Sequence, residues 1–217
     1  MNIKHLISSV MKGYSLLRAY ENDYVKNIEI TGTGIDLGAK SKDAKYYEYF
    51  DMSTVTKVDF VDYYSGGQGV VKLDLEKPFG IDSKAYDFVL MFNVMEHIYN
   101  YKNLLDETVR ILKPGGKLHG FVPFMWHYHP DPNDYFRFSE QALKSIIERD
   151  GLSELKVIPI CYGPFKVAAT VIGSVFKIKA LKIFIYLTAI YLDKVLMRVS
   201  SGATRYSMAY YFSATKL

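Results

Sequence analysis

The sequence predicts an α/β domain in which buried strands alternate with helices, and two features of its pattern indicate this fold class. Short apolar runs end near four polar side chains: Asp36, Asp59, Asp74 and Asn93. The intervals between these runs suit alternating strands and helices. Residues 113–116, Lys-Pro-Gly-Gly, then follow an amphipathic segment, where proline stops a helix and glycine turns the chain into the next strand.

The composition is that of a globular protein. The chain has 217 residues, enough for one domain with a sizeable core, and 49% of them are hydrophobic against 23% charged. A net charge of +4 with scattered basic residues does not indicate nucleic-acid binding. Cys161 is the only cysteine, which excludes an intrachain disulfide and a metal site built from several cysteines. Residues 1–20 do not resemble a signal peptide, so we expect a cytoplasmic protein.

The first half of the chain is expected to supply the central strands. Residues 3–20 have the apolar spacing of an amphipathic helix that covers one side of the sheet. The predicted strands span residues 28–37, 55–61, 70–75 and 86–93. Gly32 and Gly34 indicate a bulge or a turn in the first of them. The last is a near-continuous apolar run, typical of a central parallel strand that is buried on both faces.

The second half of the chain contains a long apolar insert at residues 165–199. The elements predicted around it are helices at 104–112 and 141–147 and strands at 117–122, 155–161 and 208–215. Charged residues divide the insert into pieces of about ten apolar residues, whereas a membrane-spanning helix needs about 20. Three interpretations remain open: helices that form a lid over a substrate, a homodimer surface, or an interfacial helix on a membrane.

The ordered series of strand ends resembles the class I S-adenosylmethionine-dependent methyltransferases, and within them the type 11 group. The resemblance covers roughly residues 30–147 and rests on the turn at 34–40, the strand ends, the segment 93–97 and the Lys-Pro-Gly-Gly turn. It implies a Rossmann-like fold with a mostly parallel seven-stranded sheet and helices on both faces. It also implies S-adenosyl-L-methionine as the cofactor.

The turn after the first strand is where this resemblance implies the closest approach to the cofactor. Asp36 ends the strand, and Gly38 begins a turn in which the backbone can meet a ligand. The family usually has glycines two and four residues after Gly38, but this chain has Lys40 and Lys42. Lys40 is the better candidate to pair with the methionine carboxylate of the cofactor. A solvated lysine on a loop is the alternative.

The ends of the next three strands are implied to hold the rest of the cofactor. An acid after the second strand accepts hydrogen bonds from the ribose hydroxyls, and Asp59 fits the spacing better than Asp62. Asp74 and the following Leu75 match the family's adenine contact, although Asp74 could also serve as a helix N-cap. Asn93 opens the segment that packs beneath the cofactor and borders the acceptor site.

Residues 123–138 are the candidate acceptor loop, because they combine aromatic residues, histidines and aspartates beyond a strand end. A histidine near its usual pKa can remove the proton from a hydroxyl acceptor at neutral pH. His129 is the first candidate base, His127 the second, and Asp134 the group that orients the base. Alternatively, Asp134 and Arg137 only fix the loop through an ion pair. The same histidines and aspartates invite a metal-site interpretation, but no ligand pair matches the family, so we expect no metal.

These residues favour a methyltransferase that acts on a hydroxyl of a small molecule or glycan by direct displacement at the methyl group. The alternative is a non-catalytic methyltransferase-like module used for binding or assembly, which the lysines after Gly38 favour. A nicotinamide-dependent oxidoreductase is disfavoured, because no Gly-x-Gly-x-x-Gly follows the first strand. The expected partners are the acceptor, with homodimer or peripheral membrane contact through residues 165–199 and no nucleic acid.

Overall fold

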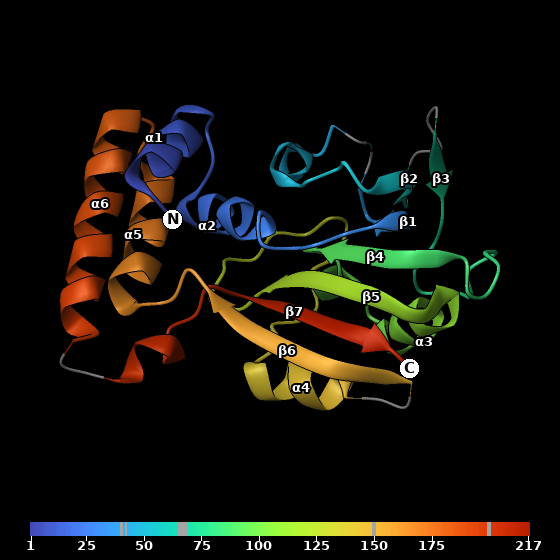
Figure 1. The fold of residues 1–217 in the computed structure, drawn as a ribbon. Coiled ribbons are helices and arrows are strands. Elements are labelled where there is room, and N and C mark those ends of the chain that lie inside the picture. Colours follow the sequence, from blue (N-terminus) through green and yellow to red (C-terminus); the bar gives the residue numbers. More distant parts are fainter. Residues whose placement is uncertain (40, 42, 65–68, 149–150, 199–200) are drawn as a thin grey trace.

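The computed structural model describes residues 1–39, 41, 43–64, 69–148, 151–198 and 201–217. They contain one seven-stranded sheet in the order β3-β2-β1-β4-β5-β7-β6 (Figure 1). The strands are β1 (Gly32–Leu37), β2 (Val55–Asp62), β3 (Val70–Lys72), β4 (Tyr86–Phe92), β5 (Leu112–Pro123), β6 (Leu152–Ile160) and β7 (Ala209–Lys216). Among these strands, β7 pairs antiparallel with β5 and β6, and the other pairs are parallel. This arrangement confirms the predicted mostly parallel sheet.

The order of the strands reverses between β1 and β4. The chain continues from β1 to β2 and β3 on one side of the sheet, and from β4 to β5, β7 and β6 on the other. In open α/β sheets, ligands bind beyond the carboxyl ends of the strands at such a reversal. The segments that leave β1, β2 and β4 are therefore the place to look for a site.

Helices cover both faces of the sheet (Figure 1). They are α1 (Ile3–Met11), α2 (Leu16–Val25), α3 (Tyr101–Ile111), α4 (Glu140–Ile147), α5 (Pro164–Val175) and α6 (Lys179–Leu196), with 3-10 turns η1 (Lys45–Tyr49), η2 (Met95–His97) and η3 (Ser201–Arg205). In β4, Val89 and Met91 face the core shared with α3 and α4. Phe88 and Leu90 face the opposite core, shared with α1 and α2. The central strand is thus buried on both sides, as its apolar run predicts.

The N-terminal helix expected over residues 3–20 is divided in two. α1 ends at Met11, and Gly13 takes a φ of +90°. Ser15 then caps α2, because its side-chain oxygen accepts a hydrogen bond from the backbone N of Arg18 at 3.1 Å. A glycine that ends one helix and a serine that caps the next are recognisable in sequence, but the amphipathic spacing runs through both helices without a break.

The glycines of the first strand have two different structural roles. Gly32 has a φ of +76°, and the register with β2 shifts between Gly32 and Thr33, so this end of the strand is irregular. Gly34 lies against β4, where a Cβ would stand 2.1 Å from the ring of Phe88. Only glycine allows β1 to pack this closely under an aromatic ring. β1 spans Gly32–Leu37 and is therefore shorter than the predicted residues 28–37.

The apolar insert contains α5 and α6, which lie beside α1 at one end of the sheet (Figure 1). A buried ion pair fastens the two helices, since Lys166 Nζ is 3.0 Å from Asp193 Oδ2. Asp193 also accepts hydrogen bonds from the backbone N of Phe165 and Lys166, which caps the start of α5. No helix within the described part of the chain is both long and apolar enough to span a membrane.

Candidate active site

A cavity of about 260 Å³ opens at the carboxyl ends of β1, β2 and β4. We call it the Asp62 cavity. Its lining residues come from these strand ends, from the segment after β3 and from the loop after β5: Gly38, Val61, Asp62, Tyr63, Tyr64, Leu73, Asp74, Leu75, Glu76, Asn93, Val94, His97, Ile98, Asp131, Pro132, Asn133 and Tyr135. It therefore lies where the topology predicts a ligand site.

Gly38 lies in this cavity at the predicted turn. Its φ is +88°, its backbone N donates to Val61 O at 2.9 Å, and a Cβ here would stand 2.6 Å from Cγ2 of Val94. The turn therefore requires glycine for both conformation and space. Lys40 and Lys42 lie outside the described residues, so the contact expected from Lys40 stays a prediction.

Asp59, the favoured ribose contact, is not among the residues that line the cavity. It pairs with Ile35 within the sheet, accepts a hydrogen bond from Tyr86 Oη at 3.0 Å and forms an ion pair with Lys57 at 2.8 Å. Asp62, the alternative, is buried at the end of β2 and lines the cavity. β2 continues to Asp62, so Asp59 lies within the strand and Asp62 at its carboxyl end.

Asp36 differs from expectation as well, because it lines neither this cavity nor the one described below. Its Oδ2 accepts hydrogen bonds from Tyr46 Oη at 2.6 Å and Tyr47 Oη at 2.7 Å, while its buried Oδ1 has no hydrogen-bond partner among the described residues. Burial raises the pKa of this carboxyl to about 7, and the two tyrosine hydroxyls oppose that rise. η1, which follows the predicted glycine turn, thus holds the acid of the first strand inside the protein.

Asp74 and Leu75 line the Asp62 cavity, as the sequence predicts. Asp74 Oδ1 accepts from the backbone N of Glu76 at 3.1 Å, and Oδ2 is 3.0 Å from Nζ of Lys77. The hydrogen bond from Lys77 lowers the pKa of this carboxyl, which therefore stays ionised at neutral pH. Asp74 combines a turn-stabilising role with a position on the cavity wall.

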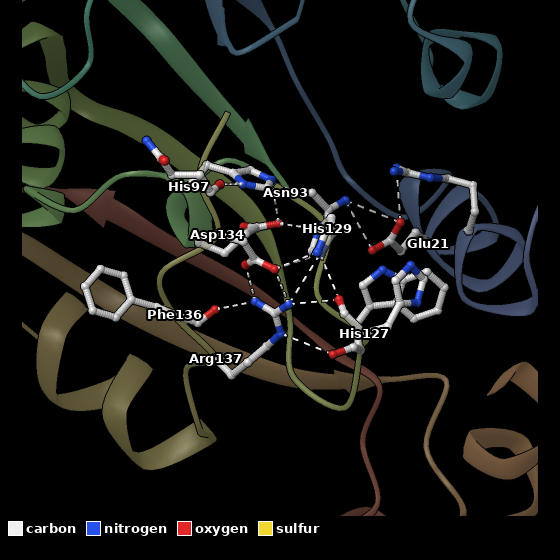
Figure 2. A network of polar contacts seen from close by, with 12 residues as sticks. Glu21, Asn93, His97, His127, His129, Asp134, Phe136 and Arg137 are labelled. Atoms are coloured by element: carbon white, nitrogen blue, oxygen red, sulfur yellow. Dashed lines mark hydrogen bonds and ion pairs between the residues drawn. The ribbon is translucent and has the colours of Figure 1, made fainter. Parts of the chain in front are cut away.

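A second cavity of about 240 Å³ adjoins the first, and we call it the Trp126 cavity. It is lined by Ser15, Leu17, Arg18, Glu21, Asn93, His97, Pro123, Trp126, His129 and Asp131. Asn93, His97 and Asp131 line both cavities. Asn93 takes a φ of +55°, and its Nδ2 donates to Oε1 of the buried Glu21 at 3.3 Å (Figure 2). These three residues form a wall common to the two cavities.

The acceptor loop brings together three of the predicted residues (Figure 2). Asp134 Oδ2 lies 3.3 Å from Nδ1 of His129 and accepts a hydrogen bond from the His129 backbone N at 2.8 Å. Arg137 holds both oxygens of Asp134, at 2.5 and 2.7 Å. This fork holds the pKa of Asp134 far below its usual range. Asp134 thus contacts both His129 and Arg137, and its role in orienting a catalytic base stays a prediction.

His127 and His129 are placed differently. His129 lines the Trp126 cavity, whereas His127 is not among the residues that line either cavity. The backbone carbonyl of His127 accepts from Arg137 Nη2 at 3.0 Å, and its ring lies against Trp126 with 4.5 Å between the ring centroids. Of the two histidines, His129 is thus the one that lines a cavity, and its role as a base stays a prediction.

Glu96 is a site residue that the sequence interpretation missed. It is fully buried, and its Oε1 lies 3.7 Å from Nε2 of His97 and 3.7 Å from Nε2 of His129. The nearby carboxylate raises the pKa of the His129 imidazole, against an opposing effect of burial. The signal that could have found it is the Glu-His pair directly after the most apolar strand.

Comparisons with known proteins agree with this architecture. Residues 29–119 match the family model described as a methyltransferase domain, a range that takes in β1 to β4 but ends before the acceptor loop. No curated protein matches the chain. A SAM-dependent methyltransferase from Aquifex aeolicus shares 15% identity over 97% of this chain and 98% of its own, with a TM-score of 0.55. A SAM-dependent methyltransferase from Thermotoga maritima shares 16% over 99% and 98%, with a TM-score of 0.57.

A third similar structure belongs to a larger protein. It is the phosphoethanolamine N-methyltransferase 2 of Haemonchus contortus in complex with S-adenosyl-L-methionine, with 14% identity and a TM-score of 0.53. The match covers 90% of this chain and 52% of the larger one. Residues 29–119 thus match a methyltransferase domain, and these solved structures show that the chain shares the fold of S-adenosylmethionine-dependent methyltransferases.

Proposed function

We propose that the chain transfers the methyl group of S-adenosyl-L-methionine, bound in the Asp62 cavity, to a hydroxyl of a small molecule or glycan bound in the Trp126 cavity. The observation that carries this proposal is the wall common to the two cavities, formed by Asn93, His97 and Asp131. Methyl transfer needs the donor carbon and the acceptor oxygen aligned within a few ångström, which two adjoining cavities can provide.

Cofactor recognition is assigned to the carboxyl ends of β2 and β3. Asp62, at the end of β2, accepts hydrogen bonds from the two ribose hydroxyls. Asp74 and the backbone of Leu75 face the adenine, where an ionised carboxylate accepts from the exocyclic amine. Gly38 lets the backbone approach the methionine end closely, because this position carries no Cβ.

The transfer itself needs little acid catalysis from the protein, because the sulfonium is already a good leaving group. The S–CH₃ bond breaks with its electron pair left on sulfur, which converts the sulfonium into a neutral thioether, while the acceptor oxygen forms the new bond to carbon. The hydroxyl proton passes to water or to the imidazole of His129, which lines the acceptor cavity, as this bond forms. The contribution of the chain is alignment of the two ligands in cavities that exclude part of the water.

The Trp126 cavity supports a polar, hydroxylated acceptor. Trp126 offers an aromatic face on which a sugar or phenolic ring can stack. Ser15, Arg18 and Glu21, at the start of α2 and within it, contribute polar groups to the same cavity. Arg18 Nη1 lies 3.1 Å from Glu21 Oε2, so these two charges balance each other. No residue of α5 or α6, which the lid interpretation requires, is among the lining residues of either cavity.

Two measurements test the proposal. Calorimetric titration with S-adenosyl-L-methionine should show binding that Asp62→Ala weakens and that the matched control Asp59→Ala leaves unchanged. Transfer of a radiolabelled methyl group to a panel of sugars and phenols should then identify hydroxyl acceptors. Cofactor binding without transfer to any hydroxyl would favour the non-catalytic module, and transfer only to amines would overturn the acceptor class.

A further inference from the structure

Three side chains from two separate segments converge beside the Trp126 cavity: Glu96, His97 and His129. One ligand atom from each lies within 4.8 Å of the other two, and Glu96 Oε1 is 3.7 Å from Nε2 of each histidine. Backbone hydrogen bonds join the two segments, because N of Tyr135 and N of Phe136 both donate to Glu96 O, at 2.9 and 3.3 Å. The convergence is therefore built into the fold.

The neighbours of both imidazoles determine which nitrogen carries the proton. Nδ1 of His97 lies 2.5 Å from the backbone carbonyl of Asn133, which can only accept a hydrogen bond. Nδ1 of His129 lies 3.0 Å from the carbonyl of His127 and 3.3 Å from Asp134 Oδ2, which are also acceptors, and 3.3 Å from the donor Arg137 Nη2; the two acceptors, one of them charged, favour a proton on Nδ1. In the neutral tautomers that fit these partners, both Nε2 atoms present lone pairs to Glu96.

Glu96 adds a third acceptor and a negative charge to this cluster. Its side chain is 0% exposed, and neither carboxylate oxygen has a hydrogen-bond partner within the described ranges. A buried carboxylate needs a cation or donors to compensate the loss of water. Arg137 is committed to Asp134, with both of its terminal nitrogens at 2.5 and 2.7 Å from the carboxylate oxygens. The carboxylate oxygen and the two Nε2 atoms face one another and form a candidate cation-binding cluster.

We propose that Glu96, His97 and His129 bind one divalent transition-metal ion of the Zn²⁺ or Fe²⁺ class through a carboxylate oxygen and two Nε2 atoms. Two imidazoles with one carboxylate suit these ions, whereas Mg²⁺ and Ca²⁺ prefer sites made of oxygen. Ligand bonds of about 2.1 Å in a tetrahedral site separate neighbouring ligand atoms by about 3.4 Å. The 3.7 Å separations need only a small closure to reach that geometry.

The surroundings resemble the outer shell of a metal site. A metal-bound histidine usually donates its other N–H to a carbonyl or carboxylate, which fixes the ring. Asn133 O does this for His97, and His127 O with Asp134 does it for His129. His97 and His129 line the Trp126 cavity, so the remaining coordination position faces the acceptor.

The consequence for the reaction rests on the proposed function. A hydroxyl coordinated by such an ion loses its proton more readily, and the released proton passes to solvent. The oxygen would then be held, with enhanced nucleophilicity, next to the wall that both cavities share. The site therefore identifies acceptors as molecules with an ionisable hydroxyl that can coordinate a metal.

The test measures metal binding directly on tag-free protein stripped with a chelator. Titration with ZnCl₂ by calorimetry and with CoCl₂ by visible absorption should show one site, with MgCl₂ binding much more weakly. Glu96→Gln and His129→Ala should weaken binding by roughly 100-fold or more, and Asp134→Asn by roughly 10-fold through the outer shell. His127→Ala is the matched control, because it alters a histidine of the same loop and keeps the backbone carbonyl. It should bind like the parent.

Far-UV circular dichroism should show that each variant is folded. A folded parent that binds no Zn²⁺ or Co²⁺ at one equivalent, or equal affinity in parent and Glu96→Gln, would overturn the proposal. Loss of turnover in His129→Ala with a metal-free parent would instead make His129 the general base. S-adenosyl-L-methionine titrations on the same samples separate the two proposals: cofactor binding without metal refutes only the site, and metal binding without cofactor refutes only the proposed function.

Discussion

Asp36 offers the sharpest physical prediction, because it is a buried carboxyl whose environment opposes ionisation. Its pKa is raised to about 7 by burial, although Tyr46 and Tyr47 donate hydrogen bonds to it. In the unfolded chain the same group ionises near 3.8. Below about pH 4 the carboxyl is neutral in both the folded and the unfolded state, so its burial does not lower the free energy of unfolding through a buried charge. As the pH rises, the unfolded state loses its proton first, and the free energy of unfolding falls until the folded state ionises near pH 7.

The size of this fall follows from the two pKa values. The difference between 3.8 and about 7 corresponds to about 4 kcal/mol of unfolding free energy, because each pKa unit is worth about 1.36 kcal/mol. The variant Asp36→Asn cannot ionise and should lack this contribution. The parent should therefore lose stability relative to Asp36→Asn between pH 4 and 7, and the difference should be constant above pH 8.

Urea unfolding followed by Trp126 fluorescence and far-UV circular dichroism at pH 4.5 to 8.5 would measure both proteins. Taking the difference between parent and variant removes the contributions of other titrating groups. Tyr47→Phe provides a second variant, because it removes a hydrogen bond that lowers the pKa of Asp36. In Tyr47→Phe, the decrease in the free energy of unfolding should therefore continue to higher pH than in the parent. A parent-to-variant difference that does not change with pH would refute the assignment of Asp36 as a buried carboxyl of raised pKa.

Three further substitutions test the site and the insert. Asp62→Ala should weaken S-adenosyl-L-methionine binding by about 1.5–3 kcal/mol by calorimetry, with Asp59→Ala near the parent value; the reverse order would restore the assignment made from sequence spacing. Gly38→Ala should lower both cofactor affinity and stability, the latter by about 1–3 kcal/mol, because of its positive φ and lack of space. Unchanged affinity would show that this turn does not approach the cofactor. Asp193→Ala should destabilise by about 3–5 kcal/mol in urea unfolding, since Lys166 is left buried and unpaired; a loss below about 1 kcal/mol would contradict that account.

The sheet was predictable because its signals are local. The run at 86–93 is apolar on both faces of β4, and the Lys-Pro-Gly-Gly segment begins just after the end of α3, so periodicity and the proline stop signal located these elements. The same four residues lie within β5 and not in a turn before it, so the start of that strand was predicted too late. The exact ends of the strands were harder to predict from sequence. β2 continues to Asp62 because it pairs with β3 there, where Asp62 lies opposite Lys72. No spacing rule within one strand contains that information.

The site depended still more on distant contacts. Glu21 meets Asn93 across 72 positions of sequence, and Glu96 meets His129 only after the acceptor loop folds back onto η2. The helix break at Ser15, which allows α2 to contribute Glu21, was hidden within one amphipathic pattern. Sequence therefore indicated the histidine-bearing loop and the cofactor edge, while the partners that define their chemistry appeared only in three dimensions.

The wall shared by the two cavities has a thermodynamic consequence. Because Asn93, His97 and Asp131 line both cavities, any adjustment of this wall by a ligand in one cavity changes the surface of the other. Linkage requires that the effect be reciprocal: if the cofactor tightens acceptor binding by some factor, the acceptor tightens cofactor binding by the same factor. In the proposed reaction the methyl group crosses this wall, and the methylated and demethylated cofactors differ at that group, so their coupling factors should differ. Product release would then depend on which form of the cofactor occupies the neighbouring cavity.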